Sequence, residues 1–482
     1  MGTGTAAGRT GTGIGNRNQG LGGTRATGTN AMGRTGAGTM RGTGAGMGRG
    51  TAAGMGRGTG TGMGRGTGTV SRAASHPLPG RQVSLHGGGT ASIRPNGQIR
   101  SINRNGMQIS RGLNGSRHIE SMHNGARVVT TGNHSGYVQR PYVVRNGQTY
   151  VSRTTVVNNV TYMSVYRSYS YGGYCCYYGY HPAYFYAPVY YGWAYNPWPA
   201  PVYYGWGWGG NPWYGYYGGY FAPYPTYPSA AFWLTDYLIA ANLQAAYAAR
   251  AAAANNSAGD AGGGQGGQSS GNDNSGSASN SGQVTLSPEV KQAIADEVKA
   301  QLAAEQGAAQ QGSSSGGSEA SSAGGQASSG SQDVPPALDP AKRTFVVAND
   351  MTVSADGQEC QLTQGDVITR LSDQPDSDRN VSVSVAASKK SDCAVGKQVA
   401  VGVDDLQEMY NHFQEQIDNG MKDLSSKQGS NGLPKAPDTT AKPSDVPPPP
   451  PDNSAAKALE EQQTQADQVE AQVVKEAFSQ GS

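Results

Sequence analysis

The chain has 482 residues, of which 73 are Gly, and its hydrophobic fraction is only 36%, against about 45–50% in an ordinary globular domain. This shortage of apolar side chains excludes one large, well-packed enzyme core over most of the length. Charged residues make up 14% and the formal net charge is +3, so the chain is not a charge-rich disordered polymer either.

The small net charge hides two halves of opposite sign. Residues 1–250 contain 21 Arg, no Lys and two acids, Glu120 and Asp236, which gives a formal charge of +19. Residues 251–482 contain 15 basic and 31 acidic residues, which gives −16. We expect the basic half to attract either the acidic half or an external polyanion.

Residues 1–81 are predicted to form a disordered arm rich in Gly, Arg and Thr. The first 70 residues contain 26 Gly and eight Arg, with one Arg at about every eighth position, and no acid. Gly at alternate positions makes ordering costly and leaves little surface to bury. The arm also lacks the apolar stretch of roughly 7–15 residues that a secretory signal peptide needs.

Residues 82–170 are predicted to form a β-meander or a stack of hairpins. Asn-Gly pairs begin at Asn96, Asn105, Asn114, Asn124 and Asn146, and short strand-like runs lie between them. Asn-Gly favours a tight hairpin turn, since both central residues of that turn need positive φ. The apolar content of each run is low, so such a sheet needs a partner surface.

Residues 171–228 are predicted to be an extended, turn-rich ribbon of Tyr, Trp, Pro and Gly. Tyr-Tyr-Gly recurs with a period of 13 from Tyr177, Tyr190, Tyr203 and Tyr216, which indicates one structural unit used several times. The density of prolines argues against a helix or a central sheet strand.

Two helices and their linkers are predicted next. Residues 229–254 are expected to form a helix that Ser229 caps and that is too polar to span a membrane. Residues 255–342 are expected to be Gly/Ser linkers around a helix over 287–305, which begins at Ser287-Pro288-Glu289.

Residues 343–424 have the pattern of a small conventional domain that folds on its own. The strand candidates are 343–348, 359–362, 367–371, 381–386 and 398–403, and a helix with an apolar stripe follows over 404–424. This pattern predicts a small β-barrel with the helix packed on it. Residues 425–482 are predicted to be a Pro-rich spacer and a last helix near 454–478, whose heptad-like spacing favours a coiled coil.

Parts of the chain resemble a known family. The Tyr/Trp/Gly/Pro region, the helix start at 233–238 and the 343–424 domain resemble a family of uncharacterised bacterial proteins that are expected to be exported. Leu362-Thr-Gln-Gly-Asp-Val-Ile368 is similar to the Leu-x-x-Gly-Asp turn and strand of bacterial SH3-like domains. The resemblance implies an exported protein with a C-terminal SH3-like barrel, although the Trp residues usual in such domains are absent from 343–424.

No motif in the sequence indicates catalysis. GxGxxG occurs at 205–210 and 262–267, and GxSxG at 312–316, without the flanking strand and helix that these motifs need. The seven His lack the spacing of metal ligands. We therefore expect no catalytic residues, no metal and no cofactor. A pocket lined by convergent titratable side chains of 82–170 would argue for an enzyme.

The four cysteines form two pairs. Cys360 and Cys393 are predicted to form a structural disulfide, since their neighbours are polar, and two buried thiols are the alternative. Cys175 and Cys176 are adjacent in the aromatic segment. A bridge between them, pairing with another chain and no bond at all remain open.

Five tryptophans are candidate surface-binding residues: Trp193, Trp198, Trp206, Trp208 and Trp213. Aromatic faces stack on sugars or flat surfaces, and Tyr-Gly repeats favour self-association. The alternative is that these rings cover the thin meander.

We predict a non-enzymatic structural or interaction protein of the cell envelope or the extracellular space. Its expected partners are cell-surface polysaccharide or further copies of the chain, through the aromatic repeats. The alternative is a Gly/Arg-rich nucleic-acid-binding protein, in which Arg side chains contact phosphates and aromatic rings stack on bases.

Overall fold

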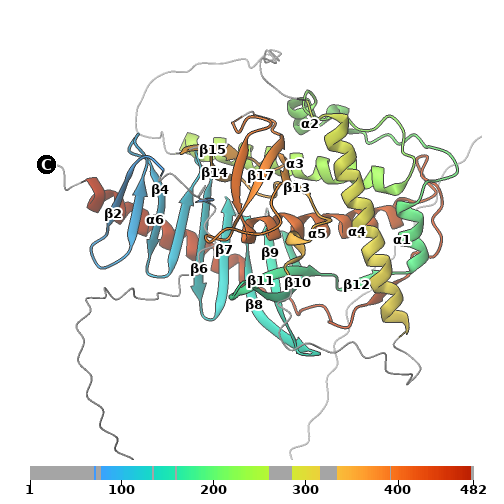
Figure 1. Ribbon diagram of the computed structural model, residues 1–482, viewed down its shortest axis with the longest axis horizontal. Coiled ribbons are helices and arrows are strands. Elements are labelled where there is room, and N and C mark those ends of the chain that lie inside the picture. Colours follow the sequence, from blue (N-terminus) through green and yellow to red (C-terminus); the bar gives the residue numbers. More distant parts are fainter. Residues whose placement is uncertain are drawn as a thin grey trace, which may run out of the picture. The chain divides into compact units, whose positions relative to one another are not determined.

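The computed structural model describes residues 70–71, 78–132, 135–157, 160–259, 285–314, 334–355, 357–390 and 392–478. These residues lie within one structural unit, residues 65–482. Most of the predicted arm and most of both Gly/Ser linkers lie outside the described residues. The described chain is mainly β, as the sequence predicts, with two large sheets and six α-helices (Figure 1).

The first sheet is a ten-stranded meander, in which each strand pairs antiparallel with the next along the chain. Its strands are β2 (Arg81–Ser84), β3 (Thr90–Ile93), β4 (Ile99–Arg104), β5 (Met107–Arg111), β6 (Arg117–His123), β7 (Ala126–Gly132), β8 (Ser135–Arg145), β9 (Gln148–Val157), β10 (Val160–Tyr171) and β11 (Tyr174–His181). The predicted meander is confirmed, and it runs one strand further than expected, into the aromatic segment.

The Asn-Gly turns lie where the sequence predicts them. Asn105, Asn124 and Asn146 have φ of 52°, 48° and 49°, and the Gly after each also has positive φ. A two-residue hairpin turn needs these left-handed values, which Asn and Gly adopt at low cost. At Asn96 and Asn114 only the following Gly has positive φ, and the loop is five residues long.

The C-terminal helix α6 (Ala455–Phe478) covers one face of the meander (Figure 1). Leu459, Ala466 and Val473 of α6 pack on an apolar stripe that crosses the sheet. The buried strand side chains of this stripe are Ala91, Ile102, Met107, Ile109, Ile119, Ala126, Val128, Val138 and Val156. The coiled-coil expectation is wrong, because the apolar side of this helix faces a sheet rather than another helix.

The second sheet has the strand order β1-β14-β18-β17-β16-β13, and β15 also pairs with β14. Its strands are β1 (Val70–Ser71), β13 (Thr344–Val346), β14 (Met351–Ala355), β15 (Gln358–Leu362), β16 (Val367–Arg370), β17 (Asn380–Ala387) and β18 (Gln398–Gly402). Within the described residues this sheet is open and no closed barrel is found, because its edge strand β13 lies against helices instead of pairing with the opposite edge.

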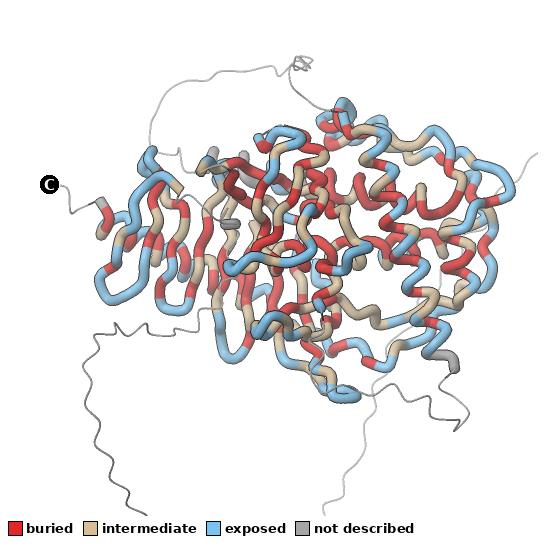
Figure 2. The backbone as a smooth tube through the Cα atoms, viewed as in Figure 1, coloured by how far each residue is buried: buried red, intermediate tan, exposed pale blue. Residues whose placement is uncertain are grey.

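Helix α5 (Val403–Lys427) follows the second sheet, as the sequence predicts. The residues of its expected apolar stripe, from Leu406 to Leu424, are buried. Their core is not confined to 343–424. It continues through buried residues of 177–243, 286–309 and 337–436, which appear as red tube in Figure 2.

The aromatic segment is not an extended ribbon. It contains β12 (Tyr184–Tyr186), α1 (Pro188–Tyr195), the 3-10 turn η1 (Trp208–Gly210) and α2 (Pro212–Tyr217), and β12 pairs with β19 (Ala441–Pro443). The expectation that prolines exclude helices here is wrong. Pro188 and Pro212 occupy the first turn of each helix, where the missing N–H would have no partner in the helix.

The 13-residue repeat is also not one structural unit. Its four Tyr-Tyr-Gly copies lie in β11, in α1, in a coil and at the end of α2. Each copy nevertheless supplies at least one buried ring: Tyr177, Tyr190, Tyr191, Tyr204 and Tyr217. The repeat thus spaces core anchors along the chain, and the local backbone differs from copy to copy.

Helices α3 (Ala230–Gly259) and α4 (Pro288–Ser314) fulfil the two helix predictions, and η2 (Pro336–Leu338) is a short 3-10 turn. The Oγ of Ser287 accepts a hydrogen bond from the backbone N–H of Val290, so α4 begins as predicted. The expected cap of α3 is wrong, since the Ser229 hydroxyl is buried without a hydrogen-bond partner. Among the described residues, no helix combines the length and apolar character needed to cross a membrane.

The basic and acidic halves meet in this fold. Seven arginines of the meander segment pair with carboxylates of the C-terminal half: Arg94 and Arg100 with Glu359, Arg104 with Glu476, Arg111 with Glu470, Arg117 with Asp467, Arg140 with Asp452, and Arg153 with Glu408. The sequence predicts that the basic half attracts either the acidic half or an external polyanion. In the described residues, the basic half contacts the acidic half.

Two arginines share the carboxylate of Glu359, whose side chain is 10% exposed. The distances from Arg94 Nε and Arg100 Nε to its oxygens are 2.9 and 2.8 Å. Arg100 is the extra residue of a β-bulge, which turns its side chain toward Glu359. Burial alone would raise the pKa of Glu359, but the hydrogen bonds from Arg100 and Arg94 lower it below its usual value.

We predict that Glu359→Gln lowers the free energy of unfolding by about 3–5 kcal/mol, because it leaves two buried guanidinium groups without their counter-charge. Glu461→Gln is the matched control, since Glu461 pairs with the exposed Lys457 one turn away, and such pairs are worth about 0.3–0.5 kcal/mol. Urea denaturation of the full chain measures both. Equal effects of the two substitutions would contradict the prediction.

Candidate functional site

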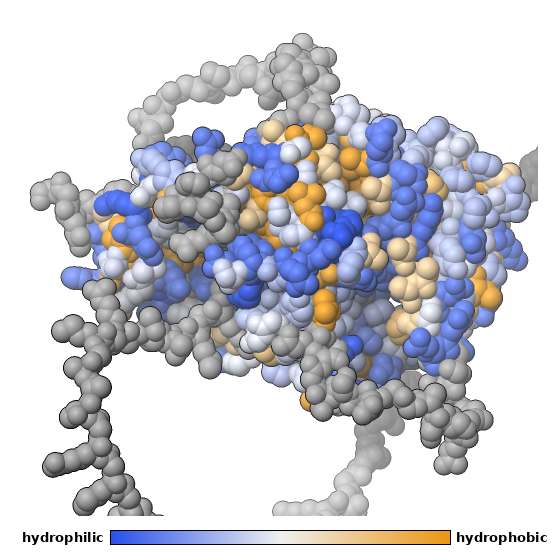
Figure 3. Space-filling model, viewed as in Figure 1, coloured by the Kyte–Doolittle hydropathy of each residue, from blue (hydrophilic) through white to orange (hydrophobic). Residues whose placement is uncertain are grey.

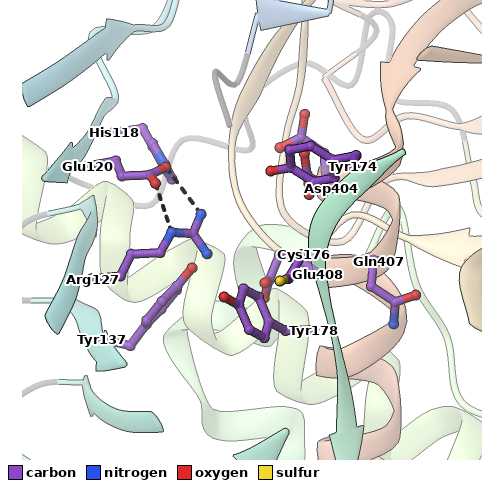
Figure 4. A pocket seen from close by; sticks show the side chains of 11 residues that line it. His118, Glu120, Arg127, Tyr137, Tyr174, Cys176, Tyr178, Asp404, Gln407 and Glu408 are labelled. Carbon is purple, nitrogen blue, oxygen red and sulfur yellow. Dashed lines mark hydrogen bonds and ion pairs between the residues drawn. The ribbon is translucent and has the colours of Figure 1, made fainter. Parts of the chain in front are cut away.

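A small charged pocket lies between the meander, its last strand β11 and the first turns of α5 (Figure 4). The sheet strands β6 to β8 contribute His118, Glu120, Arg127 and Tyr137; β11 contributes Tyr174, Cys176 and Tyr178; α5 contributes Asp404, Asp405, Gln407 and Glu408. The sheet side chains lie on the face opposite α6, because successive strand residues alternate between the two faces.

On the sheet side, Glu120 and Arg127 neutralise each other. The Nε and Nη2 atoms of Arg127 donate to the two carboxylate oxygens at 2.8 and 3.1 Å (Figure 4). Burial raises the pKa of Tyr137 to about 12 and lowers the pKa of His118 to about 4. Near neutral pH this side therefore offers one closed ion pair and two uncharged groups.

On the helix side, three carboxyl groups lie within one turn. Arg153 donates to Glu408 at 2.6 and 2.8 Å, and its charge lowers the pKa of Glu408 below the usual value although burial opposes this. Burial raises the pKa of Asp404 to about 7, against the influence of Arg379. Burial, and next the charge of Asp404, raise the pKa of Asp405 well above its usual value. Of the three, Glu408 is thus the one whose pKa lies below its usual value.

The side chains that line this pocket are typical of an acid–base site, but the volume of the pocket is much smaller than a substrate needs. The pocket has a volume of about 40 Å³, which suits one or two water molecules rather than a substrate. Within the described part of the chain, no group of three His, Cys, Asp or Glu could hold a metal ion. A pocket lined by titratable meander residues is the feature that argues for an enzyme. This pocket has room for water only, but Tyr137 and Glu408 also line a neighbouring cavity of about 300 Å³.

The structure places the five candidate tryptophans in the aromatic part of the core. Trp198 and Trp213 are buried, and Trp193, Trp206 and Trp208 are half-buried against the same cluster. Trp206 stacks between Trp208 and Trp233, with ring centroids 4.3 and 4.7 Å away. The five rings therefore do not form an exposed platform. Their cluster reaches the end of the meander at Tyr177 of β11, whereas the apolar stripe of the meander lies under α6.

The structure joins both cysteine pairs. Cys360 and Cys393 form a disulfide, with Cα atoms 5.1 Å apart, that links β15 to the loop before β18. Cys175 and Cys176 form a vicinal disulfide in β11, beside the charged pocket. Of the alternatives for this second pair, the bridge between neighbours is therefore the one observed.

Sequence reasoning did not find the charged pocket, although one observation points toward it. Glu120 and Asp236 are the two acids of the basic half. Both are buried and ion-paired, Glu120 with Arg127 and Asp236 with Lys291 at 2.8 Å. In this chain, an acidic residue in a segment with few acids thus marks a buried ion pair. No sequence pattern marks Asp404 and Asp405, which look like ordinary acids in the first turn of a helix.

Comparison of the chain with protein-family models, with curated proteins and with solved structures gives no match. The functional argument therefore depends on the geometry of the described residues.

Asp404 gives a pH-dependent prediction. Its pKa is raised from 3.8 to about 7, so the folded state holds a proton that the unfolded state releases. Stability is therefore greatest below about pH 4 and falls as the pH rises to about 7. We predict that Asp404→Asn removes up to ~4 kcal/mol of this fall, at 1.36 kcal/mol per pKa unit. Denaturation between pH 4 and pH 8 measures it.

The control for this experiment is Asp423→Asn, which changes a carboxylate on the outer end of the same helix that pairs with Lys427. Denaturation of this variant over the same pH range gives the baseline for a carboxylate outside the pocket. A profile for Asp404→Asn that parallels the unaltered chain would contradict an elevated pKa in the pocket.

Proposed function

We propose that this chain is a non-enzymatic structural or interaction protein of the cell envelope or the extracellular space. The observation that carries the proposal is the pairing of its cysteines: among the described residues no cysteine is free, and two disulfides are formed. Structural disulfides persist in oxidising compartments and are rare in reducing ones. The resemblance to exported proteins points the same way.

The internal use of the arginines supports the same proposal over nucleic-acid binding. Phosphate binding requires cationic side chains that are free to replace counterions. Seven arginines of the meander segment instead bond to carboxylates of the same chain, and Arg94 and Arg100 are almost fully buried. In this proposal, the positive charge of these described arginines has a structural role.

Adhesion or self-association would use tyrosines rather than tryptophans. Tyr203 is 73% exposed and Tyr184 is 49% exposed in the aromatic segment, and a Tyr ring offers an apolar face and a polar edge to a sugar or to another copy. Apolar and hydrophilic patches alternate on the face seen in Figure 3. The SH3-like character of 343–424 remains part of the proposal, on the Leu362–Ile368 resemblance, as a module that docks a partner.

Fractionation of cells that carry a tagged copy tests the compartment. We expect the full chain in the envelope fraction or the medium, with its cysteines protected from alkylation until a reductant is added. Protein confined to the cytoplasm with reactive thiols would overturn the proposal. Steep loss of polyanion binding with added salt would then favour the nucleic-acid alternative.

The bridge between Cys360 and Cys393 should contribute to stability. It closes a loop with a sequence separation of 33, for which loop-closure entropy predicts about 3–4 kcal/mol. We expect Cys360→Ser combined with Cys393→Ser to lower the free energy of unfolding by that amount. Cys175→Ser combined with Cys176→Ser is the control, because a separation of one constrains the unfolded chain little. Equal losses in the two double variants would contradict this account.

A further inference from the structure

A larger cavity adjoins the charged pocket on the same face of the meander. It is enclosed by strands β7 to β10, helix α3 and helix α5, and we call it the α3–α5 cavity. Its volume is about 300 Å³, which is at the lower end of the range for small-molecule sites. Tyr137, Arg153 and Glu408 belong to its wall, so the cavity continues the buried charge network just described.

The helical walls of the α3–α5 cavity differ in chemistry. Helix α3 contributes a smooth apolar wall of Ala245, Ala248, Ala249 and Ala252, which share one helix face. Helix α5 contributes Glu408, His412 and Glu415, which also share one face. Burial lowers the pKa of His412 to about 4, so this wall carries two carboxyl groups and an imidazole that is uncharged near neutral pH.

The cationic side chain on the sheet wall, Arg153, already has bonding partners within the chain. Among the described lining residues Arg153 is the one Arg or Lys. Its guanidinium lies between the rings of Tyr137 and Tyr166, 4.0 and 3.9 Å from their centroids, and it donates to both oxygens of Glu408. An anion entering the cavity would find this cation bonded and two carboxylates beside it.

Glu415 is the carboxylate that this arrangement leaves without a cation. It accepts a hydrogen bond from the Tyr166 hydroxyl, and no ion pair to Glu415 is formed among the described residues. Burial raises the pKa of Glu415 although Tyr166 and Arg153 oppose this. With Glu415 ionised the wall has one excess negative charge, which a bound cation would compensate.

We propose that the α3–α5 cavity binds a small organic ammonium ion, with its charged group against Glu415 and its apolar body against the alanine wall of α3. The rings of Tyr137 and Tyr166 already hold Arg153 between them. Tyr162, which is 54% exposed at the cavity, offers a further ring, and aromatic faces attract cations. The inference is independent of the compartment proposed above.

Three aromatic probes of similar size test the charge preference by calorimetry on the full chain: benzylammonium, benzyl alcohol and benzoate. For a ligand of this size we expect a Kd on the order of 1 mM for benzylammonium. Binding of benzyl alcohol should be at least about tenfold weaker, which is the loss of one charge-assisted contact, and benzoate should not bind. No benzylammonium binding up to about 10 mM, or equal binding of benzoate, would overturn the proposal.

Two variants locate the site. Glu415→Gln should weaken benzylammonium about tenfold or more and leave benzyl alcohol unchanged, a split that a merely structural role would not produce. Ala249→Leu, at an exposed position of the alanine wall, should weaken both ligands by filling the cavity. Asp423→Asn, on α5 but away from the cavity lining, should change neither.

If Glu415→Gln does not fold, as judged by its thermal melt, Ala249→Leu decides alone. Unchanged benzylammonium binding in Ala249→Leu would place the ligand elsewhere and overturn the proposal. Equal loss of both ligands in a folded Glu415→Gln would overturn the role of its charge.

Discussion

The pairing of a basic sheet with acidic elements from the other end of the chain is the interaction on which this fold depends. The meander has few apolar side chains per strand, and a sheet of this kind is marginal without a covering layer. Its two faces are covered by α6 on one side and by β15 and α5 on the other, and carboxylates of these elements meet the arginines of the strands. The opposite charges of the two halves are thus two parts of one packing arrangement, in which each buried arginine requires its acid.

The same constraint explains where the carboxyl groups with shifted pKa values gather. Helix α5 packs against two neighbours. Its apolar stripe belongs to the large core, and its acidic side faces the meander. Where an arginine outweighs burial, as for Glu408, the pKa is lowered; where burial dominates, as for Asp405 and for Asp404 beside Arg379, it is raised. The charged pocket and the α3–α5 cavity lie along this acidic side, in the places where sheet and helix side chains do not fill the space between them.

Local chemistry allowed much of the fold to be predicted, and long-range packing accounts for the rest. The Asn-Gly turns and the apolar stripe of α5 depend on neighbours in sequence, so the meander and the helix were predictable from residues alone. The spacing of Leu459, Ala466 and Val473 correctly predicts an apolar helix face, but such spacing does not specify whether a helix or a sheet receives it. The prolines of the aromatic segment wrongly predicted that helices are absent there, because a proline disrupts a helix in its interior but not in its first turn. Neither cavity was predictable, since each forms where strands and α5 meet across hundreds of residues.

That separation in sequence has a consequence for folding. Arg81 of β2 donates to the carbonyl of Ala477, 396 residues further along the chain, and Arg104 pairs with Glu476. The meander turns can form early because their contacts are local, whereas the contacts that bury its apolar stripe wait for the last helix. During synthesis the sheet therefore exposes an apolar stripe and unpaired arginines until α6 emerges. Once α6 is present, its acids pair with Arg104, Arg111 and Arg117, and this pairing stabilises the native sheet. The acidic half of the chain is for this reason an intramolecular counter-ion whose arrival completes the fold.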